Sequence, residues 1–200
     1  MKRASGVVLA TLLGALAVPL PTAAFQAAEV FQKGTWVLSL EGGGGGEENF
    51  DVRNEETGFD LWYAGLRVSR LPFAPLGGGA VRGSLEIGLE PIYQRYTGVV
   101  SAFFAGLALV GRLHFLGLGR VVPYVEVAGA IGGTDLNVRE IDSDFTFWLA
   151  AGAGASVFVT DRVALYAGYR LVHVSNGGTD DPNRGFEAHT GLAGVSFFLR

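Results

Sequence analysis

The chain has 200 residues, enough for one domain, and 49% of them are hydrophobic while only 17% are charged. Soluble domains carry roughly 25% charged residues, so this composition excludes an ordinary soluble domain. There is no cysteine, which excludes disulfides and thiolate metal sites. His114, His173 and His189 do not show the spacing of zinc ligands, so we expect no metal and no cofactor.

The N-terminal segment has the three parts of a secretory signal. Lys2 and Arg3 form the basic part, residues 7–18 the apolar part, and small residues ending at Ala24 the exit. We predict a signal peptide over 1–24 and an exported domain over 25–200. Cleavage removes two of 15 basic residues and none of 19 acidic ones, which leaves a net charge of 13 − 19 = −6. This charge argues against nucleic acid as a partner.

After residue 24 the sequence lacks a membrane-spanning helix. Such a helix needs about 18 consecutive apolar residues. The longest candidate, 98–111, is interrupted by glycine and is followed directly by Arg112. An exported chain of this apolar content can satisfy its backbone within a membrane only as a closed β-barrel.

Alternation with period two supports this prediction. It is clearest over 60–69 and 81–90, where apolar residues on one face oppose polar, charged or small residues on the other. Further strands are expected at these positions: 35–41, 103–113, 121–127, 145–157, 163–175 and 185–199. The eight segments predict an all-β fold, an eight-stranded antiparallel transmembrane β-barrel of the outer-membrane type. Its interior should hold these charged side chains: Arg67, Glu86, Glu90, Glu126 and Arg170.

The predicted connections give the barrel a direction. Odd-numbered connections are expected at 42–58, 94–98, 132–144 and 176–184, and even-numbered ones at 71–79, 116–120 and 160–162. The long polar connections are odd-numbered, so we assign them to the extracellular side and both termini to the periplasm. The pentaglycine 42–46 lacks the Lys-Ser/Thr of a phosphate-binding loop, and we expect a flexible surface loop there.

The stretch HVSNGGTDDPNRGFE, residues 173–187, gathers the types of side chain that perform hydrolysis. Period-two alternation from Arg170, an interior residue, places His173 and Ser175 on the outer face, and Glu187 falls on the outer face of the last strand. A hairpin symmetric about Asp180 sets His173 opposite Glu187, where Cβ atoms lie roughly 4.5–5.5 Å apart. Nucleophile, base and orienting acid then stand in the relation that a serine hydrolase requires.

The same stretch resembles the H-x-S-N…P-N-x-G-x-E signature of the PagL-type outer-membrane lipid A deacylases. It matches from His173 to Asn176 and from Pro182 to Glu187, and Gly177 stands where that signature has alanine. The resemblance implies an eight-stranded barrel that hydrolyses the ester-linked acyl chain at the 3-position of lipid A in the outer leaflet. Lipid A, or lipopolysaccharide, is then the partner, and whether the barrel forms a homodimer is left open.

The resemblance also implies a role for each residue. Ser175 is the nucleophile, His173 the general base and Glu187 its orienting partner. Asn176 and the backbone N–H of Gly178 stabilise the oxyanion. Two further positions are implied to shape the loop: Asn183 and Gly185. His189 is expected to be a spectator, because the symmetric register places it opposite Leu171.

Two other kinds of protein remain as alternatives. A non-catalytic small outer-membrane barrel with a structural or adhesive role has no reason to keep the His-x-Ser and Glu pattern on its lipid face. A soluble lipocalin-like binder would line its interior with the apolar row and turn the charged row, Arg67 to Arg170, outward.

Overall fold

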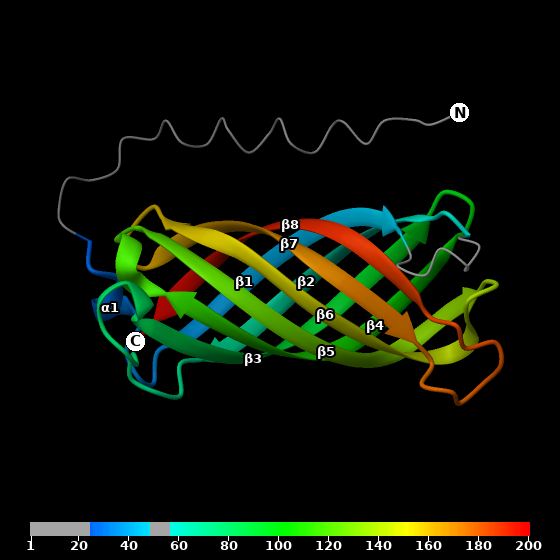
Figure 1. Cartoon of the computed structure of the whole chain (residues 1–200), viewed down its shortest axis with the longest axis horizontal. Helices are drawn as coiled ribbons and strands as arrows, with labels where there is room; N and C mark the ends of the chain where they lie inside the picture. Colours follow the sequence, from blue (N-terminus) through cyan, green and yellow to red (C-terminus); the bar gives the residue numbers. More distant parts are fainter. Residues whose placement is uncertain (1–24, 49–56) are drawn as a thin grey trace.

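The computed structural model describes residues 25–48 and 57–200, which form a closed barrel in which every strand pairs with its chain neighbours and β1 pairs with β8 (Figure 1). All pairings are antiparallel. The strands are β1 Trp36–Glu47, β2 Asp60–Arg70, β3 Gly83–Thr97, β4 Ala102–Phe115, β5 Val121–Asn137, β6 Asp142–Phe158, β7 Val163–Ser175 and β8 Phe186–Leu199. The described residues also form three short helices: α1 Ala27–Val30, η2 Gly79–Val81 and η3 Leu116–Leu118. The predicted signal segment 1–24 lies outside the described residues.

The eight-stranded antiparallel barrel predicted from the alternation is confirmed. In β2 exposed and buried residues alternate along the whole strand. The five charged residues expected inside, from Arg67 to Arg170, are all buried, whereas large apolar side chains such as Leu66 and Leu109 are exposed on the outer face. The lipocalin-like alternative required the reverse arrangement and is therefore wrong. Among the described residues, no helix is long and apolar enough to cross a membrane.

A network of ion pairs fills the middle of the barrel. Glu126 accepts hydrogen bonds from Arg112 at 2.7 Å and from Arg170 at 2.8 Å. Glu41 accepts from Arg170 at 2.8 Å and from the Tyr166 hydroxyl at 3.0 Å. All five side chains are buried. Buried charges are tolerated only when they are paired and hydrogen-bonded, so the network fixes how the interior side chains pack.

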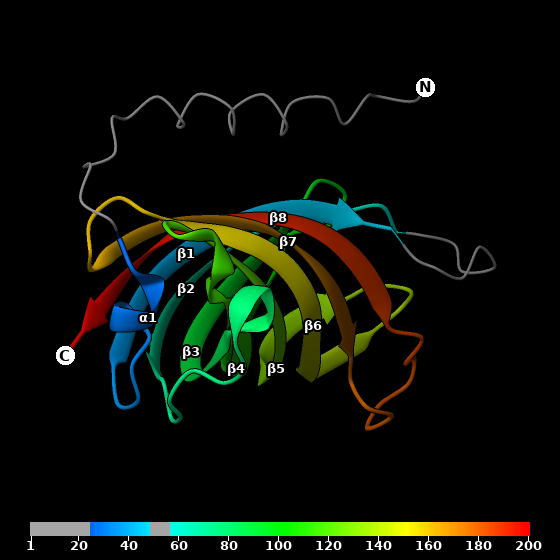
Figure 2. The same ribbon diagram turned by 60° about the vertical axis from the view of Figure 1, so that its left-hand side comes forward.

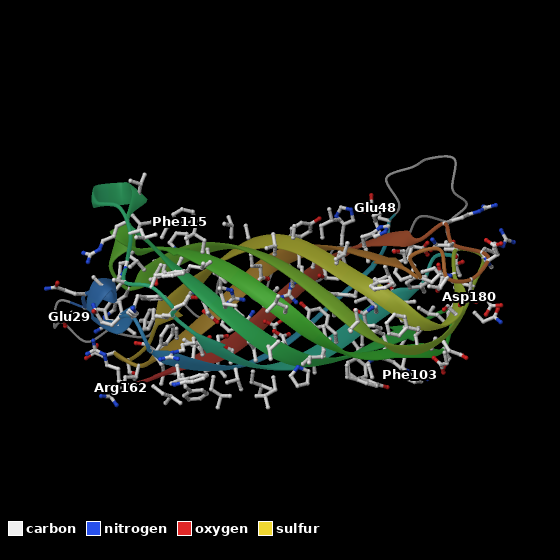
Figure 3. All side chains as sticks on the ribbon, turned by 90° about the horizontal axis from the view of Figure 1, so that it is seen from below. Glu29, Glu48, Phe103, Phe115, Arg162 and Asp180 are labelled. Atoms are coloured by element: carbon white, nitrogen blue, oxygen red, sulfur yellow. The ribbon has the colours of Figure 1, made fainter. Side chains whose placement is uncertain are left out.

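Aromatic side chains close both ends of the barrel. One end of the barrel carries α1 and is here called the α1 end (Figure 2). There the buried Phe31 packs against Phe158 and Phe198 with ring centroids 5.9 and 5.0 Å apart. At the opposite end, here called the loop end, Phe59 packs edge-on against Phe186 at 4.8 Å. Figure 3 shows Glu29 and Arg162 at the α1 end and Glu48 and Asp180 at the loop end.

The predicted loop at the pentaglycine is wrong. Residues 42–46 belong to β1 and pair with both β2 and β8. The physical reason is the close approach of the two backbones. A Cβ at Gly43 would lie 2.5 Å from the carbonyl oxygen of Gly191, and a Cβ at Gly45 would overlap the carbonyl oxygen of His189. Glycine is needed at positions 43 and 45 because the seam between β1 and β8 leaves no room there for a side chain.

Two other predicted connections are shorter than expected, because some of the residues assigned to them belong to β3, β5 and β6. β5 runs to Asn137 and β6 begins at Asp142, so only 138–141 connects them, in place of the predicted 132–144. β3 runs to Thr97, and its connection to β4 is 98–101 instead of 94–98. Polar residues in these extensions pair as strand, so a polar composition alone did not mark a loop.

The glycine seam gives a test of the fold. Gly45→Ala should prevent β1 from pairing with β8, because its methyl would overlap the His189 carbonyl oxygen. Gly46→Ala is the matched control, since a Cβ there comes no closer than 3.4 Å, to an Asp60 carboxylate oxygen. The measurement is the fraction of protein that shows heat-modifiable gel mobility. Equal fractions for the two variants would contradict the role given to the seam.

Candidate active site

The β7–β8 hairpin positions the predicted catalytic residues. Its register pairs His173 with Glu187 and Leu171 with His189, as the symmetric hairpin predicted. Val172 and Val174, the neighbours of His173 in β7, are buried in the barrel. His173 therefore projects from the outer face. The outward placement of the site therefore follows from the alternation of β7.

His173 and Glu187 are in direct contact. The imidazole Nδ1 and the carboxylate Oε1 lie 2.8 Å apart. The side chains are partly accessible, 40% exposed for His173 and 22% for Glu187. A carboxylate at Nδ1 favours the tautomer that carries its proton there, and this leaves Nε2 as the proton acceptor. The arrangement supplies an oriented base on the outer surface.

Ser175 is the last residue of β7 and lies on the same face as His173. It is half-buried, and its partner across the β6–β7 ladder is Phe147, whose ring packs edge-on against Phe145 at 5.3 Å. Within the part of the chain that the structure describes, no hydrogen bond joins Ser175 to His173. The structure thus brings His173 and Glu187 together and places Ser175 on the same face of β7, without a hydrogen bond between Ser175 and His173.

Asn176 is buried and organises the loop after β7. Its backbone N–H donates to Asn183 Oδ1 at 3.1 Å, and its side-chain amide donates to the Asp180 carbonyl oxygen at 2.9 Å. Its Oδ1 accepts the N–H of Gly178 at 2.9 Å. Both groups expected to stabilise an oxyanion therefore form hydrogen bonds within the loop, and Asn183 holds the loop to the end of β7.

Gly177, the position that departs from the family signature, has a structural reason to be glycine. Its φ of +67° lies in the left-handed region, and a Cβ there would approach Cε2 of Phe147 to 2.8 Å. Both the backbone conformation and the aromatic ring next to Ser175 disfavour a side chain at this position.

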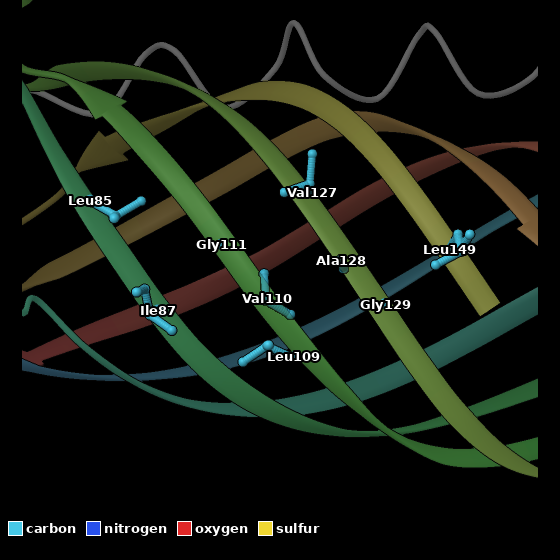
Figure 4. A pocket seen from close by; sticks show the side chains of 9 residues that line it. All are labelled: Leu85, Ile87, Leu109, Val110, Gly111, Val127, Ala128, Gly129 and Leu149. Carbon is cyan, nitrogen blue, oxygen red and sulfur yellow. The ribbon is translucent and has the colours of Figure 1, made fainter. Parts of the chain in front are cut away.

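A shallow apolar groove lies on the outer face across β3, β4, β5 and β6 (Figure 4) and was missed by the sequence reasoning. It has a volume of about 470 Å³ and is lined by Leu85, Ile87, Leu109, Val110, Gly111, Val127, Ala128, Gly129 and Leu149. Leu149 is the β6 partner of His173, so the groove begins next to His173. The signal that could have revealed it is glycine at outward positions, Gly111 and Gly129, in rows that otherwise carry large apolar residues.

One further contact on the same face was also missed. The Tyr169 hydroxyl hydrogen-bonds Nδ1 of His189, one cross-strand pair further from the loop end than His173 and Glu187. His189 therefore contacts another residue of the hairpin, Tyr169. Across residues 25–48 and 57–200, no group of three His, Cys, Asp or Glu side chains is arranged to hold a metal ion.

Comparisons with known proteins agree on the architecture. The crystal structure of the outer-membrane enzyme PagL matches with a TM-score of 0.61 and 17% identity, over 78% of this chain and 97% of that one. The crystal structure of Neisserial surface protein A matches with a TM-score of 0.57 and 15% identity, over 82% and 99%. At these identities the likeness shows the fold alone. No curated protein sequence matches the chain.

The family comparison is more specific. The model of the family described as lipid A 3-O-deacylase (PagL) matches residues 62–196, which is more than half of the chain. The match includes the whole hairpin segment from His173 to Glu187. Together with the barrel fold, it places the protein in the outer membrane. The chain belongs to the lipid A 3-O-deacylase (PagL) family.

Proposed function

We propose that this protein hydrolyses the ester-linked acyl chain at the 3-position of lipid A, with Ser175, His173 and Glu187 as its catalytic residues. The observation that carries the proposal is the His173–Glu187 hydrogen bond on the lipid-facing side of the barrel, with Ser175 beside it. A barrel with a purely structural or adhesive role gains nothing from an oriented imidazole and a hydroxyl at this position.

The chemistry is acyl transfer in two halves. His173 Nε2 removes the Ser175 proton as Oγ attacks the ester carbonyl carbon, and the resulting imidazolium protonates the leaving sugar oxygen. The acyl group is then carried on Ser175 until water, deprotonated by the same imidazole, releases it as a fatty acid. Glu187 holds the ring and stabilises its positive charge. Contacts between nucleophile and base are often loose without substrate, which agrees with the open Ser175–His173 contact.

The Asn176 amide and the Gly178 N–H are proposed to stabilise the oxyanion. Both hydrogen-bond within the loop in the structure, so one or both must exchange a loop acceptor for the oxyanion when the ester binds. An oxyanion is a stronger acceptor than a neutral amide or carbonyl oxygen, which favours this exchange.

The location of the site suits an amphipathic ester. We propose that the loop end faces the extracellular side and that the signal segment 1–24 directs export. The hairpin then holds Ser175 near the outer rim of the apolar belt, where acyl ester and water meet. Substrate reaches such a site sideways from the membrane, without entering the barrel.

The groove that begins at Leu149 is proposed to hold the acyl chain of the bound ester. Its lining is almost wholly apolar, and it continues from the partner of His173 across β5 and β4 to β3. An acyl chain in the groove would contact protein on several sides, which holds the ester in place for attack.

The first test of the mechanism is Ser175→Ala. We expect loss of at least about 10³-fold in release of the 3-position fatty acid, because nothing replaces the nucleophile. The folded fraction should be unchanged, because a half-buried hydroxyl near the rim contributes little to stability. Mass spectrometry of lipid A after incubation with wild-type or variant protein makes the measurement. Undiminished release by the variant would disprove the serine mechanism.

The second test separates the two members of the polar pair. His173→Asn should be nearly as damaging as loss of the serine, because nucleophile and base act as a unit. Glu187→Ala should cost less, since it removes orientation and charge stabilisation but leaves the base. His189→Ala is the control and should retain activity. If His189→Ala abolished turnover while His173→Asn did not, the assignment of the base would be wrong.

The third test concerns the groove. Gly111→Leu would fill it, and the backbone should accept the change because a Cβ at Gly111 comes no closer than 3.8 Å, to Val127. We expect slower hydrolysis of lipid A but normal labelling of Ser175 by a small fluorophosphonate, which needs no acyl groove. Ala64→Leu adds a similar side chain elsewhere on the outer face and is the control. Equal rates for the two variants would argue against acyl binding in the groove.

A further inference from the structure

Gly185 lies directly beside the imidazole of His173, where the loop returns to β8. It is buried and has a φ of +68°. A Cβ built on it would lie 2.9 Å from Cε1 of His173 and 3.4 Å from Nε2. These atoms form the side of the ring that carries Nε2, the nitrogen that is not bonded to Glu187. This side of the ring is clear only because residue 185 has no side chain.

A methyl group at this position would have no other space to occupy. On its other side lies the carbonyl oxygen of Val174, 3.0 Å from the same Cβ position. Carbon atoms in contact prefer separations of about 3.5–4.0 Å, so relief of the clash with Cε1 requires a shift of roughly half an ångström or more. Either the imidazole or the backbone of the loop must supply that shift.

The backbone around Gly185 is held from two directions. On one side, Asn183 Oδ1 accepts the N–H of Asn176 at 3.1 Å, which ties the segment to the end of β7. On the other side, Arg184 donates its N–H to the carbonyl oxygen of Glu140 at 2.8 Å, and Asn183 forms a β-bridge with Ile141.

The second anchor is itself fixed. Glu140 is buried, and its carboxylate accepts hydrogen bonds from the backbone N–H of Thr57 at 3.0 Å and from the Thr57 hydroxyl at 2.7 Å. Hydrogen bonds thus join the β1–β2, β5–β6 and β7–β8 connections next to Gly185. The backbone is held by several hydrogen bonds, whereas the partly exposed imidazole is held by the one to Glu187. A side chain at residue 185 would therefore displace the ring.

We propose that Gly185 is a positioning residue for His173. Its missing side chain allows the imidazole to lie against Glu187 while Nε2 remains clear to take the Ser175 proton. The inference rests on the proposed function, in which His173 is the base. This role explains why the residue next to the His173 ring is a glycine with left-handed backbone conformation.

The experiment compares Gly185→Ala with Gly58→Ala. Gly58 also has a positive φ, +79°, but among the residues that the structure describes a Cβ there would meet nothing within 4 Å, so that variant reports backbone strain. For each variant the His173 ¹³Cε1 resonance is recorded in detergent, assigned by its absence from His173→Asn. kcat and KM on lipid A are measured per folded molecule.

We expect the Gly185→Ala resonance to move and kcat to fall by about 10- to 100-fold with KM unchanged, because small misplacements of a reacting group carry costs of that size. Gly58→Ala should change neither quantity. An unmoved resonance in Gly185→Ala, or a loss of kcat no larger than in Gly58→Ala, would overturn the proposal.

A second variant, Gly185→Asn, allows the test to be made if Gly185→Ala folds poorly. Asparagine adopts positive φ more readily than alanine and still carries a Cβ, so Gly185→Asn keeps the clash with less backbone strain. It should show the same displaced resonance and low kcat, and wild-type values for both would overturn the proposal. Failure of the proposed function is distinguishable, because it would appear as activity retained by Ser175→Ala, whereas the imidazole resonance is read without turnover.

Discussion

The fold depends on closure of the hydrogen-bonded ladder between β1 and β8. A strand edge exposed to hydrocarbon leaves backbone groups unsatisfied, and each such group costs several kcal/mol. The seam pairs Trp36–Glu47 with twelve residues of β8 in uninterrupted register. Its glycines permit this approach, since side chains at Gly43 and Gly45 would meet the backbone of β8. Closure therefore selects a sequence that composition alone would assign to a loop.

Closure also determines the environment of each side chain. In a closed barrel every strand has one face toward the interior and one toward lipid, and a slip of one residue would exchange them. In β7 this parity sends Arg170 into the ion-pair network and His173 to the outer face, three residues later. The outward position of the proposed site therefore depends on the interior of the same strand, which is fixed by buried charge pairs.

Sequence reasoning reached the features that depend on period and parity. The barrel, the charged interior and the pairing of His173 with Glu187 follow from alternation and from a symmetric hairpin, which are local properties. It failed at the pentaglycine, because the need for glycine arises from contact with β8, almost 150 residues away in the chain. The loop hydrogen bonds of Asn176 and the clearance at Gly185 were likewise out of reach, since they depend on atomic contacts that residue spacing does not encode.

The filled interior has a consequence for the cell that carries the protein. Buried side chains fill the barrel at three levels: Phe31 at the α1 end, the ion pairs in the middle and the aromatic rings at the loop end. A barrel that is packed in this way resembles a solid rod in the membrane more than a pore. Many copies could be inserted without making the outer membrane leakier to small solutes, so the abundance of the protein is not constrained by permeability.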